Sequence, residues 1–317
     1  MAFGLTVPGA ARILASWAGC GGTGRTVLAS DIVVHQSGSA PRPLRTFLNP
    51  GRMLANLWSH RQLILQLARR DIAGRYRAAR LGLLWSIITP LIMLAIYTFV
   101  FSVIFKGARF GDDQREGHGE FAIYLFCGML IFNLFGEVAT RAPQLVVAYP
   151  NYVKKVVFPL EVLVVAALLT ALFNMAIGYG VWLIFWCLIR HGPPPLTAFY
   201  LPLVVVPLCL ATTGVGWFLA SLGVFVRDIG HAVLLVVQAL FFATPVFYTI
   251  SSVPRGFQVV MELNPLSHAL EDARRVMIRG SPPEWIWWFA SLAGSVLIAL
   301  AGYAFFMKSK RAFADVL

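Results

Sequence analysis

Charged side chains are scarce in this chain. Asp, Glu, Lys and Arg make up 13% of the 317 residues, and hydrophobic residues make up 58%. Soluble domains usually contain about 25% charged and about 45–50% apolar residues. The shortage of charge excludes an ordinary soluble globular protein and favours an integral membrane protein.

Charges are missing altogether from several long stretches. Leu81–Phe105 has 25 residues without one, Val162–Ile189 has 28 and Trp285–Met307 has 23. A helix needs about 20 apolar residues to cross a bilayer core about 30 Å thick. We therefore predict an all-α polytopic membrane protein with six transmembrane helices. The predicted spans are 81–105, 121–139, 160–189, 199–226, 231–250 and 285–307.

The predicted spans also lack the ionisable side chains that an ion or proton pathway needs. Glu137 and Glu161 fall at span ends, and Asn174 and Gln238 are singled out as polar side chains near span centres. Asn174 has two interpretations, a hydrogen bond between helices or a contact with substrate. No pair of carboxylates and no Ser/His arrangement indicates catalysis.

Cysteine patterns are absent as well. The four cysteines are single and widely spaced, which provides neither a disulfide framework nor the ligand spacing of a metal site. We predict no metal site. No convincing signal peptide precedes the first span, so that span is expected to act as the internal insertion signal.

The sequence also lacks the pattern of a nucleotide-binding domain. Residues 19–26 differ by one residue from the phosphate-binding loop GxxxxGK[ST], with Arg25 in the position of the Lys. That loop works between a strand and a helix in a folded nucleotide domain. The polar segment before the first span is too short, and lacks the strand pattern, to build such a domain. We expect no cofactor to bind this chain.

Basic charge is present, and its distribution is uneven. The net charge is +12, and residues 1–80 contain 11 Arg against two acidic residues. By contrast, 106–120 has three basic and four acidic residues, and 254–284 has four of each. Basic loops on one side follow the positive-inside rule, which predicts that both termini are cytoplasmic. No motif of aromatic and basic residues accompanies the charge, so nucleic acid is not an expected partner.

Three regions follow one another along the chain. Residues 1–45 are rich in Gly, Ala, Ser and Pro, and we expect a disordered or loosely structured extension. Residues 46–80 have apolar residues at helical spacing, which predicts a basic amphipathic helix on the cytoplasmic membrane interface; a collar of snorkelling Arg side chains is the alternative. Residues 81–317 form the six-span domain. The interface-helix side chains of interest are Arg69, Arg70, Asp71, Arg75 and Arg77.

Two connections between predicted spans are unusual. The cytoplasmic link between spans two and three is half apolar and carries the pair Lys154 and Lys155. It suits a short helix that lies on the membrane and contacts a cytoplasmic partner. The external link after span five contains an amphipathic run, Leu263–Ile278, which predicts a short external or re-entrant helix.

Aromatic residues are abundant, with 24 Phe, 9 Tyr and 9 Trp. Tyr97, Phe101 and Phe105 follow i, i+4, i+8 and share a helix face, and Phe132 and Phe135 share another. Such faces stack on the apolar faces of sugar rings. Packing against lipid and aromatic belts at the membrane interface are the ordinary alternatives.

Several short motifs follow one another along the chain. They are Arg70–Arg77 (RDIAGRYR), Leu81–Trp85 (LGLLW), Pro90–Leu91, Tyr97–Ser102 (YTFVFS), Asn151–Glu161 (NYVKKVVFPLE), Ala243–Tyr248 (ATPVFY) and Leu263–Leu266 (LNPL). In this order and spacing they resemble the membrane subunit of type-2 ABC exporters for bacterial cell-surface polysaccharides, which include lipopolysaccharide O-antigen, capsule and teichoic acid. The resemblance covers about residues 45–317.

The resemblance implies a permease subunit in the bacterial inner membrane and not an enzyme. It implies a homodimer paired with two ATP-binding cassette subunits that bind ATP and Mg, and a lipid-linked glycan as substrate, with O-antigen as the first candidate. It also implies short external helices between spans five and six. The implied ATPase-coupling residues are Ala142, Gln144, Tyr149, Asn151, Lys154, Lys155 and Glu161. The candidate glycan-channel residues are Trp85, Tyr97, Phe101, Phe105, Phe132 and Phe135.

Three other functions stay open. An ABC exporter of capsule, teichoic acid, lipid or drug fits the same architecture. An ion-coupled secondary transporter requires buried carboxylates and internal repeats, which are not evident. A polytopic membrane enzyme requires clustered acidic or His side chains, and such a cluster occurs in 112–120, although its Gly-rich setting favours a solvated loop.

Overall fold

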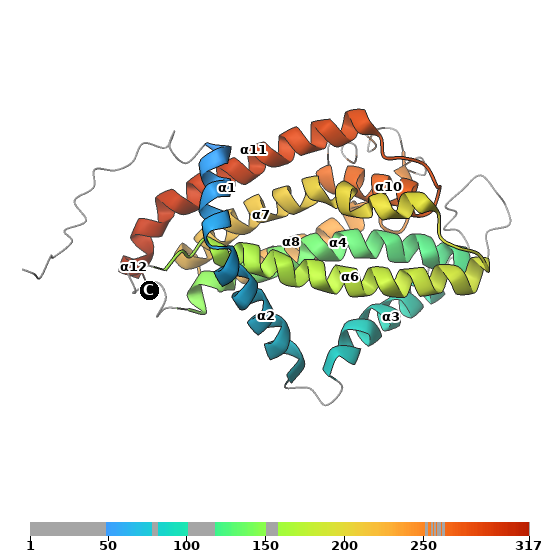
Figure 1. The fold of residues 1–317 in the computed structure, drawn as a ribbon, viewed down its shortest axis with the longest axis horizontal. Coiled ribbons are helices and arrows are strands. Elements are labelled where there is room, and N and C mark those ends of the chain that lie inside the picture. The colour runs from blue at the N-terminus through green and yellow to red at the C-terminus, as the bar shows by residue number, and fades with distance from the viewer. Residues whose placement is uncertain are drawn as a thin grey trace, which may run out of the picture. The chain divides into compact units, whose positions relative to one another are not determined.

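The computed structural model describes residues 49–77, 82–100, 118–149, 158–250 and 264–316, with five single positions between 253 and 261. These residues form helices and connecting turns without a strand (Figure 1), so the all-α prediction is confirmed for them. Predictions for 1–45 and 101–117 lie outside the described residues. The helices are α1 (Pro50–Ser59), α2 (Arg61–Arg77), α3 (Trp85–Thr98), α4 (His118–Val147), α6 (Val162–Arg190), α7 (Leu201–Phe225), α8 (Ile229–Ala243), α10 (Pro265–Met277), α11 (Trp285–Ser309) and α12 (Phe313–Val316).

Four of the six predicted spans correspond to helices long and apolar enough to cross a membrane. Within the described residues these are Gly119–Val147, Val162–Arg190, Leu196–Phe225 and Trp285–Ala312. The first and fifth predicted spans correspond to the shorter apolar helices α3 and α8. The helix α8 ends at Ala243, seven residues before the predicted end at 250, because Pro245 has no backbone N–H to continue the helix.

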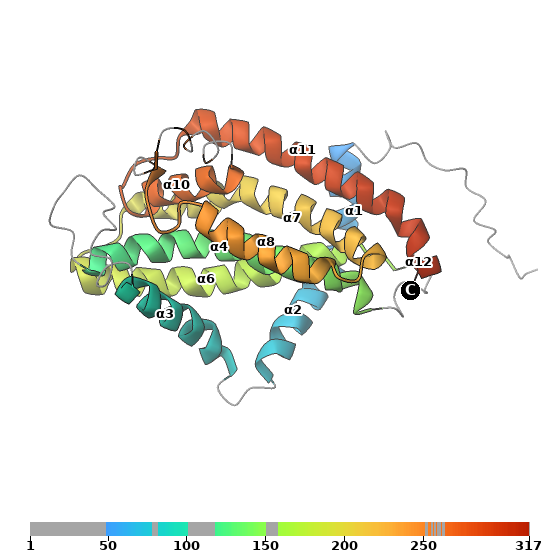
Figure 2. The same ribbon diagram turned by 180° about the vertical axis from the view of Figure 1, so that it is seen from behind.

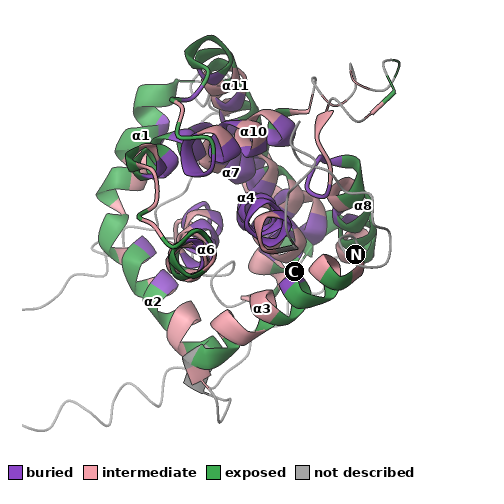
Figure 3. Cartoon of the chain, turned by 90° about the vertical axis from the view of Figure 1, so that its right-hand side faces the viewer, coloured by how far each residue is buried: buried purple, intermediate pink, exposed green. Residues whose placement is uncertain are grey.

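The helix α4, which corresponds to the second predicted span, is the centre of the bundle. It packs against α3, α6, α7, α8 and α10, and Figure 3 shows its purple, buried surface enclosed by its neighbours. In its most apolar window 83% of the residues are buried, against 33% for α11, which lies at the edge. Seen from behind in Figure 2, α8 crosses α4 and α7. Most side chains of α4 therefore contact protein and not lipid.

The helices α7 and α11 approach closely through glycine. A Cβ atom on Gly302 of α11 would overlap the carbonyl oxygen of Gly214 in α7. A Cβ atom on Gly214 would lie 2.5 Å from the carbonyl oxygen of Ile298. Small residues allow the backbones of membrane helices to touch, and dispersion contacts then replace the hydrophobic effect that lipid cannot supply. This contact makes α7 and α11 a tightly packed pair.

The predicted interface helix is broken in two at His60. Ser59 Oγ donates a hydrogen bond to the carbonyl oxygen of Asn56 at 2.8 Å, and His60 Nδ1 lies 2.8 Å from the same oxygen. Side chains that bond nearby carbonyls compete with the helical backbone bonds. Here α1 ends, and α2 starts in a new direction (Figure 1). The apolar face is kept on both sides of the break, because Met53, Ile64 and Ala68 are buried.

The amphipathic run after α8 is a helix, as predicted. Asn264 caps α10 by accepting a hydrogen bond from the Leu266 N–H at 3.0 Å, and Pro265 occupies the first turn. Arg274 of α10 is 1% exposed and donates to the carbonyl oxygens of Val246 at 2.8 Å and Tyr248 at 3.4 Å. Burial lowers the pKa of this guanidinium. These bonds fix α10 to the turn that follows α8.

The glycine contact predicts that two glycines of α11 differ in how well they tolerate a larger side chain. Gly302→Val forces α7 and α11 apart and lowers the stability of the purified protein by about 1–3 kcal/mol, the usual cost of overpacking. Gly294→Val is the matched control, because nothing lies within 4 Å of a Cβ atom at that position. Thermal unfolding in detergent measures both variants. Equal melting temperatures for the two would contradict the close approach.

Candidate functional site

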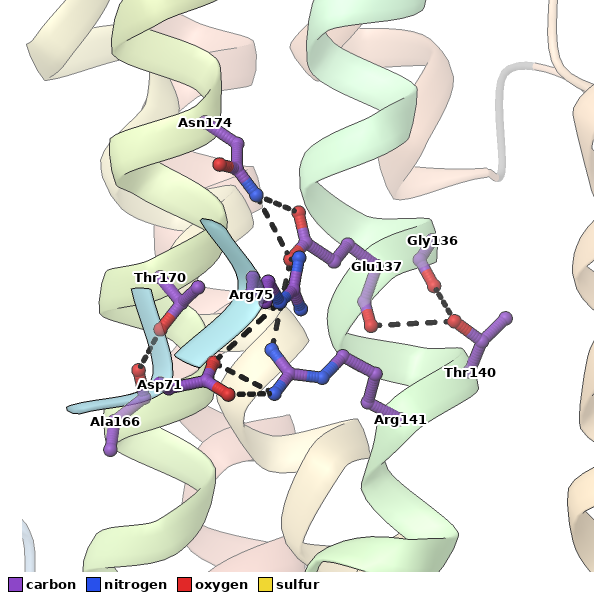
Figure 4. A network of polar contacts seen from close by, with 9 residues as sticks. All are labelled: Asp71, Arg75, Gly136, Glu137, Thr140, Arg141, Ala166, Thr170 and Asn174. Atoms are coloured by element: carbon purple, nitrogen blue, oxygen red, sulfur yellow. Dashed lines mark hydrogen bonds and ion pairs between the residues drawn. The ribbon is translucent and has the colours of Figure 1, made fainter. Parts of the chain in front are cut away.

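A carboxylate lies within the bundle on α4. The Glu137 carboxylate forms an ion pair with Arg75 of α2, whose Nη1 lies at 2.7 Å. Its two oxygens also accept hydrogen bonds from Asn174 Nδ2 of α6, at 3.1 and 2.9 Å (Figure 4). Arg141, one turn further along α4, lies 3.7 Å from the same carboxylate. Three helices therefore converge on Glu137, and its negative charge is balanced within the protein. An ionised group in this position would otherwise cost several kcal/mol.

A second carboxylate completes the network. Arg141 Nη2 lies 2.8 Å from both oxygens of Asp71 on α2, and Arg75 Nε lies 3.9 Å from Asp71. Asp71 and Arg75 are one turn apart on α2, and Glu137 and Arg141 are one turn apart on α4. The two helices thus present complementary pairs whose formal charges sum to zero. The four side chains are between 20% and 32% exposed, so they are only partly screened by solvent.

The end of α4 makes a further contact with α2. The guanidinium of Arg70 lies 5.6 Å from the ring centre of Tyr149, in the geometry of a cation–π interaction. Tyr149 is half-buried and packs on the cluster that contains Met53 of α1 and Val146 of α4. The predicted coupling residue Tyr149 and the predicted interface residue Arg70 are therefore neighbours.

A second polar junction surrounds Glu161, just before α6. Its carboxylate accepts from Asn56 Nδ2 at 2.9 Å and from Lys310 Nζ at 2.8 Å, and Asn56 Nδ2 also lies 3.0 Å from Tyr303 Oη. The backbone carbonyl of Glu161 accepts from Trp217 Nε1 at 2.9 Å. Burial raises the pKa of Glu161, but Lys310 and the hydrogen bond from Asn56 outweigh it, so the pKa lies below the ordinary 4.5. The junction joins α1, α7, α11 and the C-terminal segment.

A cavity of about 520 Å³ lies beside the Glu137 network. It is bounded by α3, α4 and α6 and reaches Arg75 on α2. Its polar lining includes Asn133, Glu137 and Asn174, and its aromatic lining includes Trp85 and Phe132. This volume falls within the range of ligand pockets, about 300–1,000 Å³.

The predicted coupling and interface residues are distributed as follows. Ala142 is buried in α4, and Gln144 is exposed close to Gly230 at the start of α8. Arg69 is exposed on α2. The side chains of Asn151, Lys154, Lys155 and Arg77 lie outside the described residues. Glu161 is enclosed within the subunit, with 4% of its side chain exposed.

The predicted channel aromatics are divided among different surroundings. Trp85 and Phe132 line the 520 Å³ cavity. Tyr97 packs on Phe241 and Phe247 with ring centres 5.8 and 5.2 Å apart. Phe135 lines a separate cavity of about 160 Å³ between α7, α8, α10 and α11. Phe101 and Phe105 lie outside the described residues. Phe132 also packs on Phe241, with ring centres 4.9 Å apart, so Phe132 and Tyr97 share a neighbour.

Reasoning from the sequence missed Asn133 and the partners of Glu137. It placed Glu137 at a span end because the second span was expected to stop at 139, whereas α4 continues to Val147. The signal was available, because Asn133, Glu137 and Arg141 recur every four residues and so share a helix face. The partners Asn56 and Lys310 of Glu161 are distant in sequence, and no local pattern indicates them.

Among the described residues, no group of three or more His, Cys, Asp and Glu side chains is placed to hold a metal ion. The polar groups of the site are instead paired with one another. The site is thus a set of links between helices, with an adjoining cavity.

Comparison with known proteins identifies the family. The O-antigen export system permease protein RfbA of Klebsiella pneumoniae is 24% identical over 266 residues, which cover 84% of this chain and 99% of that protein. The protein of the same name from Myxococcus xanthus is 24% identical over 266 residues, covering 83% and 98%. The polysialic acid transport protein KpsM of Escherichia coli is 25% identical over 216 residues, covering 67% and 79%.

A family model described as ABC-2 type transporter matches residues 62–278. The matched segment begins in α2 and ends just after α10, so it includes Asp71, Arg75, Glu137, Arg141 and Asn174. It spans more than half of the chain. This chain therefore belongs to the ABC-2 type transporter family, as a multi-pass membrane permease subunit that is not itself catalytic.

Proposed function

We propose that this chain is the permease subunit of an ATP-driven exporter that moves a lipid-linked polysaccharide across the bacterial inner membrane, with lipopolysaccharide O-antigen as the first candidate. The observation that carries the proposal is the near full-length similarity to permeases named for O-antigen export. The similarity to a polysialic acid transport protein supports a polysaccharide as the general class of substrate. Capsule, teichoic acid, a lipid or a drug is the alternative cargo. The charge pairing of Glu137 favours a structural role for that carboxylate over ion coupling.

The proposed assembly is a homodimer with two separate ATPase subunits and both termini in the cytoplasm. In support, α1, the C-terminal helix α12, the end of α4 and the start of α6 lie at the same end of the bundle (Figure 1). Basic side chains that cluster at this end include Lys308, Lys310 and Arg311. Cytoplasmic ends of membrane helices carry such an excess of Lys and Arg.

In the proposed mechanism, motion of the ATPases enters through the segment from Ala142 to Lys155. The Asp71–Arg141 and Arg75–Glu137 pairs then transmit this motion between α4 and α2, because separating them would strand charges inside the protein. The Glu161 junction holds α1 and the C-terminal segment to the same end. The glycan passes through a channel at the dimer interface with the first span as its wall.

The exposed Arg69 and the Arg70 side chain over Tyr149 have two proposed roles. One is contact with the ATPase or with the pyrophosphate of the lipid carrier. The other is binding of anionic lipid head groups, at about 1 kcal/mol for each basic side chain. Both roles require the interface helix to lie at the membrane surface.

Deletion of the gene in its host tests the proposed function directly. We expect the surface polysaccharide to disappear while full-length lipid-linked polymer accumulates in the cytoplasm, measured by immunoblot of both fractions. Loss of the polymer from both fractions would indicate a synthetic role, and an unchanged surface would indicate another cargo.

The lysine pair tests the coupling segment. Replacing Lys154 and Lys155 with Glu is expected to uncouple ATP hydrolysis from export, because a basic contact with the ATPase becomes repulsive. Hydrolysis by the purified complex and surface polymer in cells are measured together. Lys308→Glu is the matched control, an exposed lysine in the last turn of α11 at the same end. Normal export in the Lys154/Lys155 variant would count against the coupling role.

The charge network tests transmission between α2 and α4. Arg141→Met leaves Asp71 with Arg75 alone at 3.9 Å, which should lower stability by about 1–3 kcal/mol and raise the ATP hydrolysed per polymer exported. Arg190→Met is the control, because it breaks the Arg190–Glu120 pair at 3.3 Å, whose exposure is similar, at the opposite end of the bundle. If both variants show the same coupling ratio, the network does not transmit the motion.

A further inference from the structure

The 520 Å³ cavity has a lining that is unusual for the interior of a membrane bundle, and it includes two candidate channel residues, Trp85 and Phe132. Its walls come from α3, α4 and α6, with Val237 of α8 at one side. Its volume is that of a small-molecule pocket. The described lining comes from one subunit.

An unsatisfied amide opens into this cavity. Asn133 lies half-way along α4, about 20 Å from either end at 1.5 Å per residue, and its side chain is exposed. In the part of the chain that the structure describes, no group donates to or accepts from this amide. A polar side chain at bilayer depth costs free energy without a partner, and such side chains mark substrate paths. Asn174, by contrast, is bonded to Glu137.

The charges at the cavity are balanced, which disfavours an anionic ligand. The two guanidiniums of Arg75 and Arg141 are balanced by the carboxylates of Glu137 and Asp71. A pyrophosphate would require an excess of positive charge, which these two pairs do not supply. The lining groups that could contact a ligand are neutral. They are the Asn133 amide, the Thr89 hydroxyl and the ring of Trp85, which is 46% exposed.

An amide and a hydroxyl beside an aromatic ring match the chemistry of a sugar ring. The hydroxyls of a sugar exchange hydrogen bonds with amide and hydroxyl groups, and its C–H faces stack on an indole. We propose that this cavity binds a neutral sugar residue of the polymer within each subunit, with Asn133 as the hydrogen-bonding group and Trp85 as the stacking surface. This inference rests on the proposed function, because it presumes that a glycan is transported.

Photo-cross-linking of the full transporter tests occupancy. The photoreactive residue p-benzoylphenylalanine replaces Asn133, or in a second variant Thr89, in cells that carry the ATPase subunits and the host's own polymer. We expect adducts that react with an antiserum against that polymer. Ile184 of α6 is the control position, because it is 61% exposed and does not line the cavity. Adducts with lipid alone, no adduct, or equal polymer adducts at 184 would overturn the proposal.

Substitution tests the role of the amide. Asn133→Leu should lower the export rate by about 2- to 10-fold, the effect of one lost hydrogen bond, and Asn133→Gln should restore most of it. Gln238→Leu is the control, because it removes another exposed side-chain amide from an apolar helix without lining the cavity. Melting temperatures of the purified variants identify any loss that comes from misfolding.

Different results would contradict the proposed function and the sugar site. If deletion of the gene leaves the surface polymer unchanged, the proposed function is wrong. If deletion abolishes export but Asn133→Leu exports at the wild-type rate, or Gln238→Leu is equally impaired, only the sugar site is wrong.

Discussion

Glu137 puts a carboxylate inside an apolar helix, and the arrangement around it follows from neutralising that charge. The residue lies about 15 Å from the end of α4 at 1.5 Å per residue. Arg75 must come from α2, Asn174 from α6, and Arg141 from the next turn of α4 to surround it. Because an unpaired charge at this depth is costly, α2 can leave α4 only if several charged contacts break together. A helix outside the spans thereby becomes part of the bundle.

The Glu161 junction extends the same logic to the chain ends. Its carboxylate is more deeply buried than Glu137, and its partners Asn56, Tyr303 and Lys310 come from α1, α11 and the C-terminal segment. The Glu161 junction lies just before the start of α6, and the Glu137 network lies ten residues before the end of α4. The opposite end is held differently, by Arg274 of α10 on the carbonyls after α8. We infer that force applied at the link reaches several helices at once.

Much of the fold is predictable because the bilayer imposes a simple length requirement. Four of the six predicted spans correspond to long helices, and the run Leu263–Ile278 corresponds to α10. The helix α4 extends eight residues beyond the predicted span end at 139, to Val147, and the charge of Arg141 in this extension is paired with Asp71. The break at His60 depends on two side chains that share the Asn56 carbonyl, which helical periodicity does not reveal.

The candidate site was less predictable than the fold. Asp71 and Arg75 were among the side chains singled out on the interface helix, but their partners lie on α4 and depend on tertiary packing. Phe132 and Phe135 were predicted to share a helix face, yet they line different cavities, since a shared helix face does not determine what that face meets. Asn133 could have been identified from the sequence, because it precedes Glu137 by one helical turn.

The central claim is that α2 and α4 move together because the four-charge network joins them. Spin labels on cysteines placed at Gln66 of α2 and Ala148 after α4 measure it, by double electron–electron resonance on the full complex with its ATPase subunits. Both positions are exposed. The account predicts the same distance distribution without nucleotide and with ATP trapped on a hydrolysis-deficient ATPase, and a broader one when Arg141 is replaced by Met. A shift of the native distance on ATP binding would contradict it.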